Sequence, residues 1–184
     1  VLLSLDQGDN LPSPVRNTAA GWRLAVDIDH LTVRSVEPLS ALVSMIDTLQ
    51  GFGPRGGEIY LVLSELYSNA VDYGLLGLGA LRAEGRGGAD LFLERQRRLG
   101  ALESGTVRIA FQHYAEPDGG ALEITVSHDG AGFDYEAVMA SMDETWPSEV
   151  CGLSLVRSLC ERIGFEEGGR SVVARYRWYD GATT

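Results

Sequence analysis

The sequence predicts an α+β protein: a two-layer sandwich in which a mixed, mostly antiparallel sheet is covered by helices on one face. Several segments alternate apolar and polar residues with the period of a half-buried strand, and two of them are joined by a short turn typical of a hairpin. Other segments have the spacing of amphipathic helices, and they do not alternate strictly with the strands. Together these observations favour a sandwich of the α+β class.

In the N-terminal half, residues 1–20 contain several prolines and glycines and are expected to form a linker with little structure. A strand should follow over residues 22–28. A helix through the high 30s and 40s should bury Leu39, Val43, Ile46 and Leu49. After a Gly-Pro-rich break at residues 51–57, a second helix should bury Ile59, Val62, Leu63, Leu66 and Ala70. Residues 21–184 are therefore expected to form one domain.

Residues 74–88 are rich in Gly and Leu and indicate a loop. Residues 89–102 then have the pattern of an amphipathic helix, with an outer face formed by Glu94, Arg95, Arg97 and Arg98. Alternating runs at 107–111 and 122–126 flank a turn at 116–120 and predict a hairpin.

The C-terminal part should contain a short helix over residues 135–142 and a polar loop over 143–150. The next predicted helix, over residues 153–163, should turn inward the side chains of Leu153, Val156, Leu159, Cys160 and Ile163. A final strand should bury Val172, Ala174, Tyr176 and Trp178.

The composition excludes several functional classes. The 184 residues carry a formal net charge of -11, which argues against nucleic acid or an anionic membrane as a partner. All 15 basic residues are Arg, so mechanisms that require a Lys are excluded. Two Cys do not form a zinc or disulfide framework, and with no apolar run of membrane-spanning length we expect a cytoplasmic protein. Because the chain begins at Val1, we expect it to be a piece of a longer protein.

The first segment of chemical interest is ELYSNAVDYG, which starts at Glu65 in the second predicted helix. Glu65 and Asn69 are four residues apart and therefore project from one helical face. A carboxylate beside a carboxamide suits a general base next to a magnesium ligand, because Mg²⁺ prefers oxygen donors. The same pair on a solvated helix surface would have no such role.

The second segment is VSHDGAGFD, where a strand ends in a turn that contains Gly130 and Gly132. Glycines allow a backbone to approach a ligand closely, although such turns are also common in loops without a ligand. His128 continues the inward phase of the preceding strand, so a polar ring should point to the buried side. A lone inward His is more often structural than a ligand.

The third segment is VCGLSLVRSLC, in which Gly152 leads directly into a helix. The N-terminal amides of that helix could meet a phosphate, but a glycine before a helix is common. No single segment is decisive.

Taken together and in this order, the three segments resemble the N, G1 and G2 boxes of the GHKL (Bergerat-fold) ATPases. This superfamily includes histidine-kinase ATPase domains, gyrase and heat-shock-90 ATPases, and anti-sigma serine kinases. The stretches SELYSNAVDYG and VRSLCERIGF look closest to the branch of anti-sigma factors and serine-protein kinases. The insert at residues 75–105 is similar to ATPase domains at the C-terminus of bacterial response regulators fused to a serine phosphatase. The resemblance covers residues 22–178.

The resemblance implies a role for each matched residue. Glu65 matches the base that acts on a water or serine hydroxyl, and Asn69 matches the ligand of Mg²⁺. Gly130 and Gly132 match the turn under the adenine of ATP. The resemblance places Asp72 and Tyr73 near the ribose and phosphates of ATP. It places Cys151, Gly152 and Leu153 on the phosphate side.

Two positions depart from the family pattern. His128 stands where the family has the Asp that accepts the adenine amino group, and Asp129 follows one residue later. Val150 stands where the third box normally begins with Gly. We expect His128 to weaken ATP binding and to make it pH-sensitive, with Asp129 as the rival adenine contact.

The resemblance therefore leads to a principal hypothesis. The chain would be a serine-protein kinase and anti-sigma factor that uses ATP and Mg²⁺ to phosphorylate a serine of a small STAS-type anti-sigma-factor antagonist. A sigma factor would be a second partner. The sequence does not determine the oligomeric state, and a homodimer is one alternative. The alternative is a catalytically degraded module of the same fold that holds protein partners without phosphoryl transfer. A histidine-kinase catalytic domain is disfavoured because no dimerising helix with a phosphorylatable His precedes Trp22.

Overall fold

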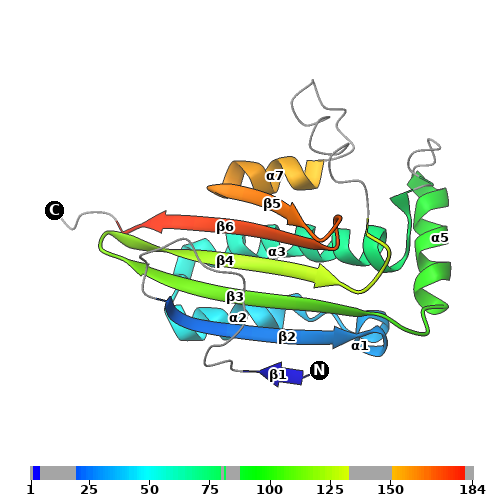
Figure 1. The fold of residues 1–184 in the computed structure, drawn as a ribbon, viewed down its shortest axis with the longest axis horizontal. Helices are drawn as coiled ribbons and strands as arrows, with labels where there is room; N and C mark the ends of the chain where they lie inside the picture. The colour runs from blue at the N-terminus through cyan, green and yellow to red at the C-terminus, as the bar shows by residue number, and fades with distance from the viewer. Residues whose placement is uncertain (1, 5–19, 80, 82–87, 133–150, 181–184) are drawn as a thin grey trace.

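The computed structural model describes residues 2–4, 20–79, 81, 88–132 and 151–180. Its strands form one six-stranded sheet in the order β1-β2-β3-β4-β6-β5, and every neighbouring pair is antiparallel (Figure 1). The strands are β1 (Leu2–Ser4), β2 (Ala20–Asp29), β3 (Thr106–Glu116), β4 (Gly119–His128), β5 (Arg162–Glu166) and β6 (Ser171–Tyr179).

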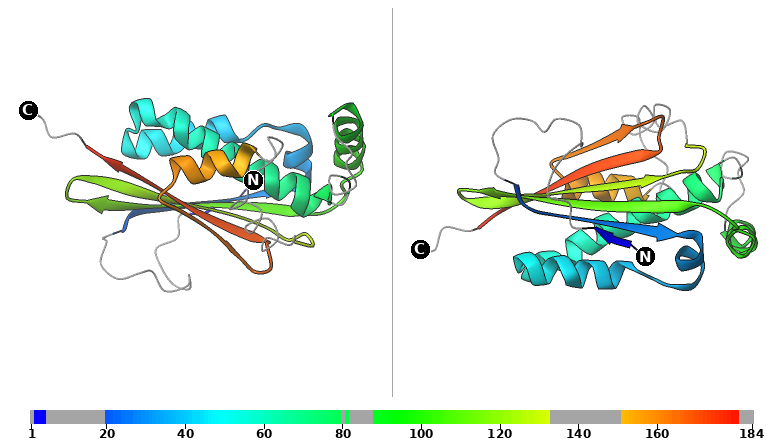
Figure 2. Two further views of the ribbon diagram at one scale, coloured as in Figure 1. Left: turned by 90° about the horizontal axis from the view of Figure 1, so that it is seen from above. Right: turned by 60° about the horizontal axis from the view of Figure 1, so that its bottom comes forward.

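The helices lie on one face of this sheet and at one of its ends. They are α1 (His30–Ser35), α2 (Leu39–Gln50), α3 (Gly56–Asn69), α5 (Gly88–Gly100) and α7 (Cys151–Leu159), with a 3-10 turn η1 (Gly53–Arg55) and a π-helical turn η2 (Ala70–Leu75). Seen from above, α2, α3 and α7 lie on the same side of the sheet, whereas α5 stands beyond its end (Figure 2). This is the α+β two-layer sandwich that the sequence predicts.

The core lies between the sheet and the three covering helices. On β4 the alternation predicted from the sequence places Leu122, Ile124 and Val126 in the core, each at most 1% exposed. The predicted face of α3 is also confirmed, because Ile59, Val62, Leu63 and Leu66 are fully buried. The hairpin of β3 and β4 turns at Pro117 and Asp118, as expected.

The first predicted helix is confirmed as α2, and a short helix that the sequence did not predict, α1, precedes it. α1 follows β2 directly, and the side chain of Asp29 caps it by accepting from the backbone N–H of Thr32 at 2.8 Å. Glu37 accepts from the backbone N–H of Leu39 at 2.8 Å and so assists the start of α2. The inward face of α2 is formed by Leu39, Leu42 and Ile46, whereas Leu49 is 50% exposed.

The predicted helix over residues 153–163 is too long. α7 ends at Leu159, and the backbone N–H of Glu161 donates to the carbonyl of Arg175 at 2.8 Å, which starts the pairing of β5 with β6. Ile163 therefore faces inward from a strand. Ile163 fits the helical spacing, but Ile163 and Phe165 also fit the two-residue period of a strand. In so short a segment the two patterns overlap, and this is why the helix was predicted to continue.

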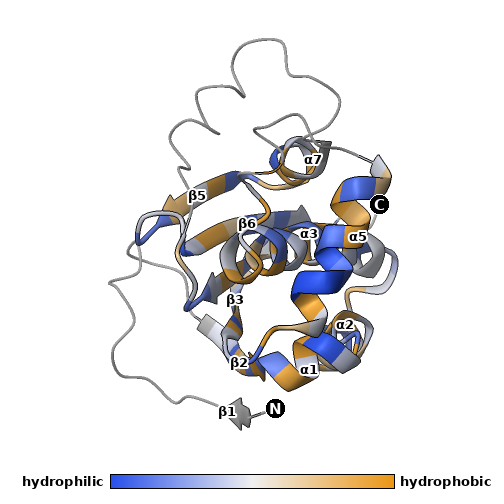
Figure 3. Ribbon diagram, turned by 90° about the vertical axis from the view of Figure 1, so that its right-hand side faces the viewer, coloured by the Kyte–Doolittle hydropathy of each residue, from blue (hydrophilic) through white to orange (hydrophobic). Residues whose placement is uncertain are grey.

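Two further expectations concern the ends of the described ranges. Leu2–Ser4, inside the expected linker, pairs with β2 as a short edge strand. The predicted helix at 135–142 and the loop at 143–150 lie outside the described residues. Figure 3 views the molecule from the end at which α5 stands, where hydrophilic and hydrophobic residues alternate along this helix.

Candidate functional site

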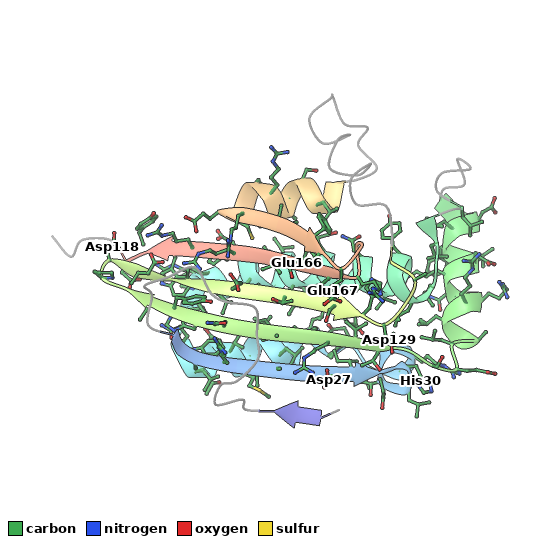
Figure 4. All side chains as sticks on the ribbon, viewed as in Figure 1. Asp27, His30, Asp118, Asp129, Glu166 and Glu167 are labelled. Carbon is green, nitrogen blue, oxygen red and sulfur yellow. The ribbon has the colours of Figure 1, made fainter. Side chains whose placement is uncertain are left out.

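The three segments singled out from the sequence lie close together at one end of the sheet. α3 packs on α7 and continues into η2, and η2 packs on the last residues of β4. Asp129, which directly follows β4, marks this end of the sheet in Figure 4, opposite the hairpin turn at Asp118. The fold therefore unites residues that are separated by more than 80 positions in the sequence.

Glu65 and Gly152 join the first segment to the third. Glu65 is half-buried on α3, and its carboxylate lies against the backbone of Gly152 at the beginning of α7. A methyl group built on Gly152 would stand 1.9 Å from Oε2 of Glu65. Only glycine therefore allows the carboxylate this position beside the first turn of α7.

Asn69 lies one helical turn after Glu65. Its Nδ2 atom is buried and has no hydrogen-bond partner among the described residues. The side chain lines a cavity of about 10 Å³ together with His128, Leu153, Arg170 and apolar neighbours. A volume of this size is at the lower limit for one water molecule, and the buried Nδ2 atom is an unsatisfied hydrogen-bond donor beside this mostly apolar space.

His128 is buried beneath η2 and is 9% exposed. Its Nδ1 atom accepts a hydrogen bond from the backbone N–H of Gly130 at 3.2 Å. A methyl group on Gly74 would come within 2.5 Å of the imidazole ring. Burial lowers the pKa of His128, so the ring is neutral near neutral pH and can accept this hydrogen bond.

The turn after β4 is held in place by close backbone contacts. A methyl group on Gly130 would stand 2.1 Å from the carbonyl oxygen of Gly74, so the turn rests directly on η2. Gly132 has a φ of +79°, which favours glycine, and a methyl group there would be 2.6 Å from the carbonyl oxygen of Gly168. The turn after β4 therefore packs against η2 on one side and against the β5–β6 turn on the other.

Asp129 points away from the His128 cavity and is exposed. Its Oδ1 atom accepts from the backbone N–H of Thr106 at 2.9 Å, and its own N–H donates to the Thr106 carbonyl at 3.3 Å. Asp129 thus joins the end of β4 to the start of β3. It also lines an open groove beside the C-terminal end of α5.

Asp72 and Tyr73 line a different hollow, of about 310 Å³, between η2 and α5. Asp72 forms an ion pair with Arg95 of α5 at 2.7 Å. The structure therefore brings together Glu65, Asn69, His128, Gly130, Gly152 and Leu153, while Asp72 and Tyr73 face α5. Cys151 is the first residue of α7, next to Gly152.

Sequence reasoning missed three contributors to this region: Gly74, Arg95 and Arg98. Gly74 lies within the first segment, and its role depends on contact with the His128 ring from another strand. Arg95 and Arg98 were expected on an outer face of their helix, but both are half-buried and reach toward η2. The spacing of arginines along one helix does not reveal which neighbour they contact.

The donor set fits a magnesium ion that a nucleotide would bring. Within the described ranges no three His, Cys, Asp or Glu residues form a cluster able to hold a metal ion. Mg²⁺ in nucleotide sites is usually held by one or two side chains, and phosphates and water complete its octahedron. Oδ1 of Asn69, one turn from the Glu65 carboxylate, is an oxygen donor of the kind that this arrangement uses, whereas the unpartnered buried atom of Asn69 is Nδ2, which cannot bind a metal.

Comparisons with known proteins give no family assignment. No protein-family model matches the chain, and no curated protein matches it. Among the described helices, none combines the length and apolar character that crossing a membrane requires.

Proposed function

We propose that this chain is a GHKL-type serine-protein kinase and anti-sigma factor that transfers the γ-phosphoryl group of ATP to a serine of a small STAS-type antagonist protein. Glu65 would accept the proton of the serine hydroxyl while the serine oxygen attacks the γ-phosphorus and ADP departs. Mg²⁺, held by Asn69, would neutralise charge on the phosphates. A sigma factor would be the partner in the anti-sigma role.

The observation that carries this proposal is the contact between Glu65 and Gly152. A general base must lie near the phosphate that is transferred, and the first turn of a helix is a favourable phosphate position because its amides are unpaired. The carboxylate lies beside the first turn of α7, with Asn69 on the same face of α3. A carboxylate and an amide therefore lie at one location, which supports the two proposed roles.

A specific observation favours the second candidate function, a protein-binding module without transfer. In the family, an Asp at the position of His128 binds the adenine amino group, whereas here Nδ1 of His128 is already bonded to Gly130 and its ring is covered by Gly74. Asp129 is likewise engaged with Thr106. Nδ1 of His128 is therefore occupied as an acceptor, and Asp129, which is exposed, is bonded through Oδ1 to the start of β3.

Calorimetry with ATP in the presence and absence of Mg²⁺ tests the proposal. The kinase should bind ATP more tightly with Mg²⁺, and Asn69→Ala should remove this difference because the metal loses its protein ligand. Ser68→Ala, at an exposed neighbouring position of the same helix, is the matched control and should retain the difference. Absence of ATP binding in the parent protein would favour the binding module instead.

A further inference from the structure

The helix α5 forms hydrogen bonds to η2 and the residues after it through two arginines on one of its faces. None of its described residues is buried, yet Arg95 and Arg98 are about one-third exposed and extend to η2. Positions 95 and 98 are one turn apart, so both guanidinium groups project in the same direction. Leu91 and Leu99 of the same helix pack against the hydrophobic core, and the two arginines add polar contacts to η2.

Arg95 binds the beginning of η2, and Arg98 binds its end. Nε of Arg95 donates to Oδ1 of Asp72 at 2.7 Å. Nη1 of Arg98 donates to the carbonyl oxygens of Leu76 and Gly77 at 2.8 and 2.9 Å. Carbonyls at the end of a helix have no partner within the helix, so Arg98 supplies the missing donor.

Glu94 fixes the orientation of Arg98. Its Oε1 atom accepts from Nε of Arg98 at 2.7 Å, which leaves Nη1 directed at η2. Arg97 also binds Glu94, through Nε and Nη2, at 2.8 and 2.7 Å. This second ion pair lies within α5 and makes Arg97 a natural control.

η2 in turn determines the position of the turn after β4. Gly74 of η2 covers the His128 ring, and its carbonyl oxygen lies where a methyl group on Gly130 would be. A π-helical turn is less stable than an α-helix and is often found at functional sites, so it depends on outside support. The backbone of η2 therefore connects the residues that Arg95 and Arg98 contact with those that lie against His128 and Gly130.

We propose that Arg95 and Arg98 are positioning residues that hold η2, and through it the turn at Gly130, in the conformation that binds nucleotide. This inference rests on the proposed function, since it concerns the same site. Asp72 then acts through its ion pair with Arg95. In this proposal α5, which lies between the first two segments of the site, stabilises the position of η2.

Hydrogen–deuterium exchange and calorimetry together test this inference with the variants Arg95→Gln, Arg98→Gln and the control Arg97→Gln. In the protein without nucleotide, the first two variants should exchange faster across residues 70–78, while β3 and β4 remain protected and show that the fold is intact. Mg²⁺·ATP affinity should fall about 2- to 30-fold in these variants. Arg97→Gln removes the same charge and should change neither quantity.

The outcomes separate this inference from the proposed function. If the parent protein binds no ATP, the proposed function fails and the positioning role fails with it. If the parent binds ATP but Arg95→Gln and Arg98→Gln bind it equally well, only the positioning role is overturned. Unchanged exchange of residues 70–78 in both variants would likewise overturn it. A charge exchange that pairs Asp72→Arg with Arg95→Asp should restore part of the lost affinity if Asp72 acts through the ion pair.

Discussion

The carboxylate of Glu65 occupies the space beside Gly152 into which any larger residue at position 152 would extend. The two residues come from different helices, α3 and α7, that pack against each other. The atoms closest to the added methyl group belong to the end of a flexible side chain rather than to the backbone. A substitution at position 152 therefore moves the carboxylate without breaking the fold.

We predict that Gly152→Ala displaces Glu65 and reduces phosphotransfer by at least about tenfold, because a misplacement of about 1 Å can cost about 100-fold in rate. The free energy of unfolding should change by less than about 1 kcal/mol, since alanine favours the helix and offsets the crowding. Urea denaturation and a transfer assay with a candidate antagonist measure the two effects.

Two other glycine-to-alanine variants serve as controls for this prediction. Gly57→Ala adds a methyl group to α3 that, apart from its own helical backbone, meets no atom of the described residues within 4 Å, so stability and transfer should both be retained. Gly130→Ala places its methyl group against the backbone carbonyl of Gly74, which cannot rotate away, and should destabilise the protein by about 1–3 kcal/mol. Equal transfer rates in Gly152→Ala and Gly57→Ala would contradict the role of the contact.

Glu65→Gln should lower phosphotransfer by about 100- to 10,000-fold while Mg²⁺·ATP affinity stays nearly unchanged. The amide has the same shape as the carboxylate but cannot accept the hydroxyl proton. Single-turnover transfer and calorimetry separate the chemical step from binding. Transfer at close to the parent rate would show that Glu65 is not the base.

Local patterns in the sequence predicted those parts of the fold in which burial follows a single period. The buried face of α3 and the β3–β4 hairpin are examples, because a face that packs on a core must repeat with the geometry of its element. The candidate site was predicted from the spacing that brings Glu65 and Asn69 to one helical face, together with the resemblance of three segments to the N, G1 and G2 boxes. Its convergence with Gly152 follows from tertiary packing.

Other features depend on contacts between distant residues and have no local signal. β5 is only five residues long, and its helical and strand spacings overlap, so tertiary pairing with β6 decides its structure. The ion pair of Asp72 with Arg95 spans 23 positions. The bond from Gly130 to His128 involves a ring whose place is determined by Gly74.

His113 should make stability depend on pH. Its ring stacks between Trp22 and Trp178, each at a centroid distance of 5.6 Å, and neither ring nitrogen has a hydrogen-bond partner within the described part of the chain. Burial lowers the pKa of His113, so the neutral form is favoured in the folded state. This contribution to stability is present above about pH 6.5 and is lost as the pH falls below that value.

The variant His113→Phe preserves an aromatic ring between the two indoles and removes the titration. Urea denaturation between pH 5 and pH 8 should then show a smaller loss of stability at low pH than in the parent protein. The comparison uses the slope with pH, so any cost of the larger ring cancels. An unchanged slope would exclude His113 as a contributor.

The last prediction concerns His128 and the turn that it holds. The bond from the Gly130 N–H to Nδ1 joins residues two positions apart, and this is the pattern in which an Asp or Asn side chain binds its own backbone. His128→Asn should therefore retain the turn, whereas His128→Ala loses the bond and should be less stable than the Asn variant by about 0.5–1.5 kcal/mol. Protonation of His128 also breaks this bond.

Because burial lowers the pKa of His128, the stability that its hydrogen bond contributes is present above about pH 6.5 and declines at lower pH, together with ATP affinity. In His128→Asp the carboxylate stays charged over this range, so ATP should bind more tightly than in the parent and without the loss near pH 6. ATP titrations of His128→Asp and Asp129→Ala at pH 6 and pH 8 decide between the two acceptors. Loss of binding in Asp129→Ala, with a parent-like affinity in His128→Asp, would transfer the adenine contact to Asp129.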